Sequence, residues 1–209
     1  MNRLSTLALA ALVLAGCGEP LTPLRPTPTE RPEFACDPDA DPPAVESLQW
    51  KRVAAFTADL SRALELSDDA LCEEVDAFAC RDVHRVALGG NDPFGAAQYE
   101  PVASPLVTTP TAVDRVVLAA CENAVARDEA SAPVVFTDLS PTSAPADPAA
   151  LSTQAAALYR RLLARDAEPE ELALVAELAL DPTGAPRSAR EADVLACFAI
   201  ASTTELLLF

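Results

Sequence analysis

Cysteine and histidine are the residues through which this chain could bind a metal ion or a cofactor. The sequence has six cysteines and one histidine. Cys80 and His84 lie four positions apart, a spacing that places both side chains on one face of a helix and could supply half of a zinc site. The other cysteines have no recognisable ligand spacing, and the Cys-x-x-Cys-His sequence of covalent haem attachment is absent. We therefore predict no cofactor and no metal ligand, with a bridged Cys80 and a structural His84.

Three aspartates at alternate positions, Asp37, Asp39 and Asp41, are similar to the first half of a calcium-binding loop. Pro42 occupies the position at which that loop needs glycine, and Leu48 occupies the position at which it needs a bidentate glutamate. We interpret the segment as a solvated acidic turn in which Asp41 caps the helix that follows.

Nucleophilic and acid–base catalysis are not indicated by the sequence. A serine or cysteine nucleophile needs a base beside it, and His84 is the single histidine that could serve. The sequence contains no Gly-x-Ser-x-Gly turn and no phosphate-binding glycine loop. Glu73 and Glu74 are adjacent, so their side chains would point apart on a helix. We predict that the protein is not an enzyme.

The first residues of the chain have the pattern of an export signal. Arg3 precedes an apolar run from Leu4 to Leu14 that is too short for a permanent membrane span. The run ends in Leu-Ala-Gly followed by Cys17, which resembles a bacterial lipobox. That resemblance implies cleavage before Cys17, diacylglycerol on its sulfur and acylation of its new amine. Gly18 stands where an aspartate retains enteric lipoproteins in the inner membrane, so the resemblance favours the outer membrane, on its periplasmic or surface face.

Composition divides the chain into four parts and limits its partners. We expect a signal peptide at residues 1–16, a lipid anchor with a Pro-rich spacer at 17–35, a helical subdomain at 36–140 and a three-helix subdomain at 141–209. Cleavage removes Arg3 alone among the charged residues, which changes the formal charge from −17 to −18. So acidic a surface repels phosphate backbones and anionic headgroups, which excludes nucleic-acid binding and polybasic membrane docking. The lipid on Cys17 is then the expected contact with the membrane.

Alanine-rich apolar periodicity predicts an all-α fold, a helical bundle of about six helices in two packed subdomains. A long irregular segment, residues 87–110, interrupts the helices and is called the central loop here. It contains three glycines and four prolines, together with the apolar residues Phe94, Tyr99 and Leu106. These three are our candidates for contacts with a partner. The alternative is a loop that packs on its own domain.

Five cysteines follow Cys17, and an exported chain meets an oxidising compartment, so disulfide bonds are expected among them. The simplest arrangement is two bridges and one free thiol, drawn from Cys36, Cys72, Cys80, Cys121 and Cys197. If residues 68–86 form one helix, Cys72 and Cys80 lie about 12 Å apart along its axis. Bridged Cα atoms must approach within roughly 7 Å, so we predict that these two do not pair. A bridge between Cys121 and Cys197 would tie the two subdomains together.

Residues 158–166, 169–172 and 204–207 carry a second resemblance. The sequences LYRRLLARD, PEEL and TELL resemble a helical region of large exported proteins of planctomycetes and myxobacteria, built of cytochrome-associated domains of unknown function. Ala164 replaces the usual glycine of that region, and no haem motif accompanies it. The resemblance implies an exported location and a helical fold.

Two functions are compatible with these features. The first is a non-enzymatic, lipid-anchored protein of the cell envelope with a structural role or a role in docking an exported protein through the central loop. The second is an accessory subunit of an envelope redox or metal-binding system that uses Cys80 and His84. The sequence favours the first, because the residues that would carry chemistry are missing.

Overall fold

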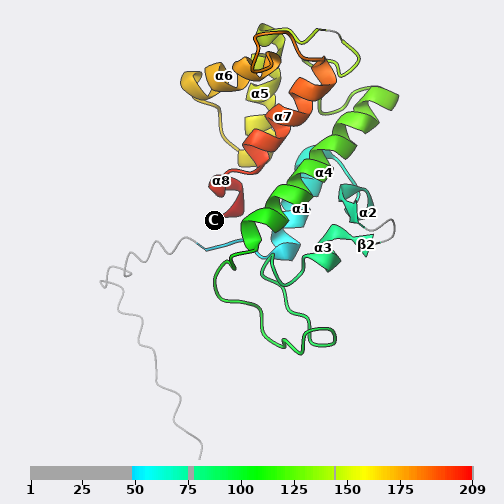
Figure 1. Cartoon of the computed structure of the whole chain (residues 1–209), viewed down its shortest axis with the longest axis vertical. Helices are drawn as coiled ribbons and strands as arrows, with labels where there is room; N and C mark the ends of the chain where they lie inside the picture. The colour runs from blue at the N-terminus through cyan, green and yellow to red at the C-terminus, as the bar shows by residue number, and fades with distance from the viewer. Residues whose placement is uncertain (1–48, 75–77, 144, 209) are drawn as a thin grey trace, which may run out of the picture. The chain divides into compact units, whose positions relative to one another are not determined.

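The computed structural model describes residues 49–74, 78–143 and 145–208, which belong to one compact unit (Figure 1). The expected lipobox, the spacer, the acidic turn and Cys36 lie outside the described residues. No helix in the described part of the chain is both long and apolar enough to cross a membrane.

The described residues are mostly α-helical, so the predicted all-α class is confirmed. The helices are α1 Val53–Leu64, α2 Asp68–Leu71, α3 Cys80–Val83, α4 Thr109–Ala130, α5 Pro148–Leu163, α6 Pro169–Ala176, α7 Ala189–Ala201 and α8 Thr204–Leu207. A 3₁₀ turn, Glu177–Ala179, continues α6. One short antiparallel hairpin, β1 Glu73–Glu74 and β2 Phe78–Ala79, separates α2 from α3.

The core lies where α4, the longest helix, packs against α1 and α7, and where α5 packs against α1, α6 and α7. The predicted apolar face of α4 is buried along its whole length. Its members are each at most 3% exposed: Val113, Val116, Val117, Ala120, Cys121 and Ala124. Residues from both predicted subdomains contribute to this one hydrophobic core.

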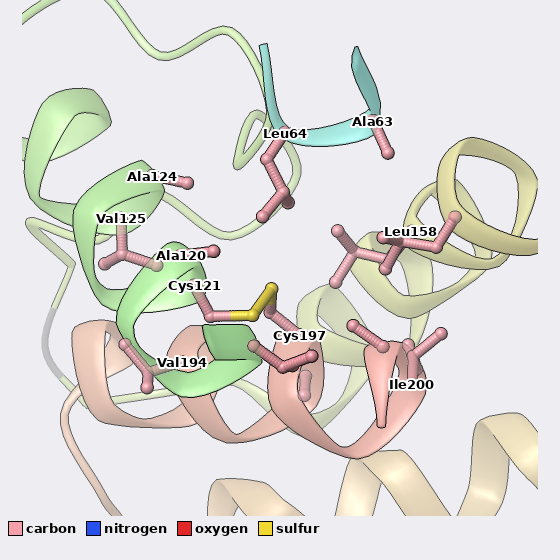
Figure 2. Packing of buried hydrophobic residues seen from close by; sticks show 14 of the residues in the cluster. Ala63, Leu64, Ala120, Cys121, Ala124, Val125, Leu158, Val194, Cys197 and Ile200 are labelled. Carbon is pink, nitrogen blue, oxygen red and sulfur yellow. A yellow bond between two sulfur atoms is a disulfide. The ribbon is translucent and has the colours of Figure 1, made fainter. Parts of the chain in front are cut away.

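The disulfide Cys121–Cys197 joins α4 to α7 inside the core. Both cysteines are 0% exposed, and their Cα atoms are 5.8 Å apart. Figure 2 shows the bond surrounded by apolar side chains from four helices, among them Leu64, Ala124 and Leu158. The pairing expected from the sequence is therefore confirmed.

The prediction that Cys72 does not pair with Cys80 is wrong. The chain is not one helix here, because α2 ends at Leu71 and Cys72 adopts an extended conformation. The hairpin then reverses the chain, so the Cys80 amide donates to the Cys72 carbonyl at 3.1 Å and a disulfide joins the two residues. Their Cα atoms are 5.4 Å apart, well below the separation that a continuous helix would impose. Ser67, which precedes Asp68 and Asp69, is predicted from its residue type to be an N-cap, and this is confirmed, because its side chain accepts from the Ala70 amide.

Two further boundaries differ from the prediction. Apolar periodicity from Pro43 to about Leu66 predicts one helix that would include residues 49–52, but Trp50 forms an antiparallel bridge with Leu208, and the Lys51 amide donates to the Leu207 carbonyl at 2.8 Å. The two ends of the described chain are thereby held together. The sequence Thr111-Ala-Val-Asp114 is similar to a capping box and predicts a helix that starts at Thr111. In the structure α4 begins at Thr109, with a proline in its first turn, where the missing amide proton costs nothing.

The two disulfides should contribute differently to stability. The Cys121–Cys197 bond closes a loop of 76 residues and the Cys72–Cys80 bond one of 8. Because loop-closure entropy grows with the length of the loop, we expect removal of the first to cost about 4.5 kcal/mol and removal of the second about 2.5 kcal/mol. Denaturant unfolding of the C121A/C197A and C72A/C80A variants measures both losses. Equal losses would contradict the assignment of the core bond as the main covalent constraint.

Candidate docking surface

The central loop leaves α3 and returns to the start of α4, at the end of the unit away from α6 (Figure 1). Its tip is closed by its own hydrogen bonds. The backbones of Asp92 and Gln98 exchange two bonds of 3.0 Å, and the Asp92 side chain accepts from the Gly95 amide at 2.8 Å. These bonds give residues 92–98 a defined turn without help from the rest of the protein.

The root of the central loop is held by one hydroxyl group. Thr109 Oγ1, in the first turn of α4, donates to the Ala87 carbonyl at 2.6 Å and accepts from the Leu106 amide at 2.9 Å. Thr109 is buried, so water competes little for these bonds. The two limbs of the loop are therefore joined where they meet the helices.

Despite this order, the loop exposes large apolar side chains. Phe94 is 100% exposed, Val107 98%, Tyr99 74% and Leu106 38%. Three of them were predicted from the sequence, and the structure places all three at the surface of the central loop. Val107 was missed. The sequence feature that could have identified it is the adjacency of Leu106 and Val107 in a segment without helical periodicity. In an extended chain two successive side chains point to opposite sides, so both cannot face inward.

A groove lies beside the root of the central loop. It has a volume of about 290 Å³, and its walls include Trp50, Leu106, Val113, Leu207 and Leu208, with Asp114 among the lining residues. The groove combines the loop, the start of α4 and the two paired ends of the described chain. It lies at the lower end of the size range of small-molecule sites, which suits it to a few side chains.

Trp50 forms one wall of this groove and is positioned by a glycine. Gly89 has a φ of +80°, and a Cβ atom at this position would lie 3.0 Å from the indole ring. Glycine is the residue that tolerates both this backbone conformation and this close approach. The indole therefore lies directly against the backbone of the central loop's first limb.

Cys80, predicted to be bridged, and His84, predicted to be structural, have different partners. Cys80 is bonded to Cys72, whereas His84 Nε2 contacts Glu74 Oε1 at 2.7 Å. The same carboxylate oxygen lies 3.1 Å from Arg115 Nε on α4. Ligand atoms of Cys72, Glu74 and Cys80 lie within 4.8 Å of one another, but both sulfurs are occupied by the disulfide. The arrangement ties the hairpin to α3 and α4.

Sequence reasoning missed a buried polar network between α4 and α5. Asp128 Oδ2 accepts from the amides of residues 134, 135 and 136 at 2.8–3.0 Å, and Oδ1 accepts from Arg127. Burial acts to raise the pKa of Asp128, but these hydrogen bonds outweigh it and hold the pKa below its ordinary value. The short run Pro133-Val-Val-Phe136 predicts either a lone strand or an extended connector, and in the structure it forms no strand.

Asp193 on α7 is the most unusual titratable group in the described part of the chain. It is 0% exposed, and neither carboxylate oxygen has a hydrogen-bond partner among the described residues. Burial, together with the nearby Asp128 carboxylate, raises the pKa of Asp193 to about 8. The folded protein therefore holds a proton on Asp193 at neutral pH.

This proton makes stability depend on pH. The folded pKa of Asp193 lies above the unfolded value of 3.8, so its stabilising contribution is complete below pH 3.8 and is lost as the pH rises towards about 8. We expect the free energy of unfolding of wild type, relative to Asp193→Asn, to fall by up to about 1.4 kcal/mol per pH unit within this window. Denaturant unfolding at a series of pH values measures the difference. Glu122→Gln, the same carboxylate-to-amide replacement at an exposed site of α4 that makes no ion pair with the described residues, is the control. A difference between wild type and Asp193→Asn that stays constant with pH would contradict the assignment.

No known protein family, curated protein or solved structure matches this chain. Among the described residues, the three most exposed large apolar side chains, Phe94, Val107 and Tyr99, all lie on the central loop.

Proposed function

We propose that this protein is a non-catalytic, lipid-anchored protein of the bacterial cell envelope that docks an exported protein through its central loop. The observation that carries the proposal is that a loop ordered at both its tip and its root presents Phe94, Tyr99 and Val107 to solvent. Exposed apolar side chains gathered on one segment are typical of interaction sites. Aromatic residues contribute most to such interfaces, because they bury a large area at a small entropic cost.

The order of the central loop strengthens this proposal. A partner that binds a preformed loop does not have to supply the conformational entropy of ordering it, so more of the contact energy appears as affinity. The exposed side chains add nothing to the stability of the free protein, since they are largely or wholly in water. Selection for folding therefore gives no reason for an apolar residue at these positions, whereas binding does.

The location in the envelope is supported by the sequence and by the cysteines. Cys17 follows a short apolar signal and lies in the lipobox-like sequence, and cleavage there would leave residues 17–35 as a Pro-rich tether. Two disulfides in the described part of the chain suit an oxidising compartment. We propose the outer membrane as the site of attachment, because Gly18 follows the lipidated cysteine.

Anchoring and docking should be separable by mutation. We expect Cys17→Ala to release the protein from the membrane fraction, because the acyl chains would be its attachment. The triple variant F94S/Y99S/V107S should stay membrane-bound, keep the wild-type stability within about 0.5 kcal/mol and lose its partner, because all three side chains are exposed. Membrane fractionation and cross-linked co-purification from native envelopes measure the two effects.

The matched control for the triple variant is Leu174→Ser on α6, where the side chain is 66% exposed and lies outside the central loop. It removes exposed apolar surface without touching the proposed site, so co-purification should persist. A partner that is retained by the triple variant, or lost equally in the control, would refute docking through the loop. A Cys17→Ala protein that still sediments with membranes would refute the lipid anchor.

The clustering of Cys72, Glu74 and Cys80, with His84 on Glu74, favours a second candidate function in a redox or metal-binding system. It requires reduction of the Cys72–Cys80 bond by an external dithiol, which is itself oxidised to a disulfide. The reduction leaves the thiols of Cys72 and Cys80, which can lose their protons and bind Zn²⁺. On this hypothesis, mild reduction of the full chain lets it bind one zinc ion, measured by metal analysis, and the C72A/C80A variant binds none. The C121A/C197A variant is the control. Absence of zinc uptake after verified reduction would exclude this function.

A further inference from the structure

The groove beside the central loop has a chemistry that selects its occupant. Its walls are mainly apolar. Leu106, which is exposed, is one of the lining residues, and the exposed Val107 follows it in the chain. The charged residue in its lining is Asp114, which is exposed and makes no ion pair with any described residue. An occupant must therefore supply an apolar side chain and must tolerate, or compensate, a carboxylate at the rim.

The stretch of chain that forms the central loop and the start of α4 carries charge of one sign. Between Val86 and Asp114 the sequence contains no lysine, arginine or histidine, but it contains Asp92, Glu100 and Asp114. Glu100, like Asp114, has no ion-pair partner among the described residues. Elsewhere many acidic side chains are paired with arginine, as Glu171 and Glu205 are with Arg165. The central loop thus combines an apolar surface with negatively charged side chains, while a cation from outside the loop, Arg52, lines a second pocket with Trp50, Val102 and Ala103.

This combination distinguishes between three occupants. A second copy of the chain would bring the same acidic loop, and a net charge of −17, against the first. A bilayer with anionic headgroups would meet the same repulsion from a chain whose net charge is −17. A protein segment with lysine or arginine beside an apolar side chain gains from both the groove and its rim, because complementary charge steers association and rejects acidic competitors.

We infer that the groove and the central loop bind a segment of an exported partner in which an apolar side chain is flanked by lysine or arginine. The inference rests on the proposed docking function and specifies the class of partner. The apolar side chain occupies the groove against Trp50 and Leu106, and the cation lies at Asp114. Phe94 and Tyr99 extend the contact along the loop.

The inference can be tested with a library of random peptides displayed on phage and selected against the immobilised full-length protein. We expect the selected peptides to be enriched in Leu, Ile, Phe or Met next to Lys or Arg. Asp114→Asn should weaken the selected peptides about two- to five-fold at low salt, the size expected for one exposed ion pair. Asp138→Asn removes an exposed carboxylate outside the loop and is the matched control, with affinity unchanged.

Trp50 gives a direct signal of occupancy, because it is the single tryptophan of the chain and lines the groove. Selected peptides should shift its emission, and Leu106→Ser should weaken that shift. Failure to enrich any peptide, enrichment of acidic or uncharged peptides, or an unchanged emission would overturn the inference. Neutral phosphatidylcholine vesicles that shift the emission more than the peptides do would assign the surface to a bilayer and overturn it as well.

Failure of this inference differs from failure of the proposed function. If co-purification from envelopes depends on the central loop but the cross-linked partner segment lacks lysine and arginine, docking holds and the charge requirement is wrong. If no partner depends on the loop, the docking function itself is wrong, whatever the peptides show.

Discussion

The structure depends on the hydrogen bonds that the Asp128 carboxylate accepts from the backbone amides of the segment after α4. Residues 134–136 form neither helix nor strand, and Val135 and Phe136 are almost fully buried. Their amides would be costly to bury without acceptors, and one carboxylate oxygen accepts all three. Gln154 on α5 completes the network by donating to the Val135 carbonyl at 2.9 Å and accepting from the Asp138 amide at 3.0 Å. Because this segment is satisfied, α5 can lie against the core formed by α1, α4 and α7.

The same corner of the protein joins other elements. Arg127 holds Asp128 with its Nε and Nη2 groups and, through Nη1, donates to the Leu64 and Glu65 carbonyls at the end of α1. At the middle of α4, the disulfide to α7 adds a covalent link. The start of α4, with Thr109, holds the root of the central loop. One helix thus connects the buried polar network, the covalent core and the exposed surface, so the loop is presented from a rigid support. A rigid support of this kind lowers the entropic cost of ordering the loop when a partner binds.

Periodicity made the helices and their buried faces predictable. On α4 every residue assigned to the apolar face is buried, because residues that recur every 3.6 positions share one side of a helix and that side packs against α1 and α7. Ser67 was recognisable as an N-cap, since that signal is local. The failures involve contacts that local pattern does not encode. The hairpin between α2 and α3 and the Cys72–Cys80 bond depend on the chain reversing within a segment whose composition also suits a helix. Trp50 was assigned to a helix because its partner, Leu208, lies at the other end of the chain.

The sequence by itself determined the all-α class, the core face of α4 and the apolar residues Phe94, Tyr99 and Leu106 of the central loop, because each follows from residue type and short-range spacing. Tertiary structure decided whether those loop residues pack inward or stay in solvent, since that depends on how the tip and the root are bonded. It also decided that Asp193 is buried without a partner and that Trp50, Leu106 and Leu207 share one groove. These features join residues up to 157 positions apart, and no spacing rule spans such a distance, because it is the packing of the whole chain that brings them together.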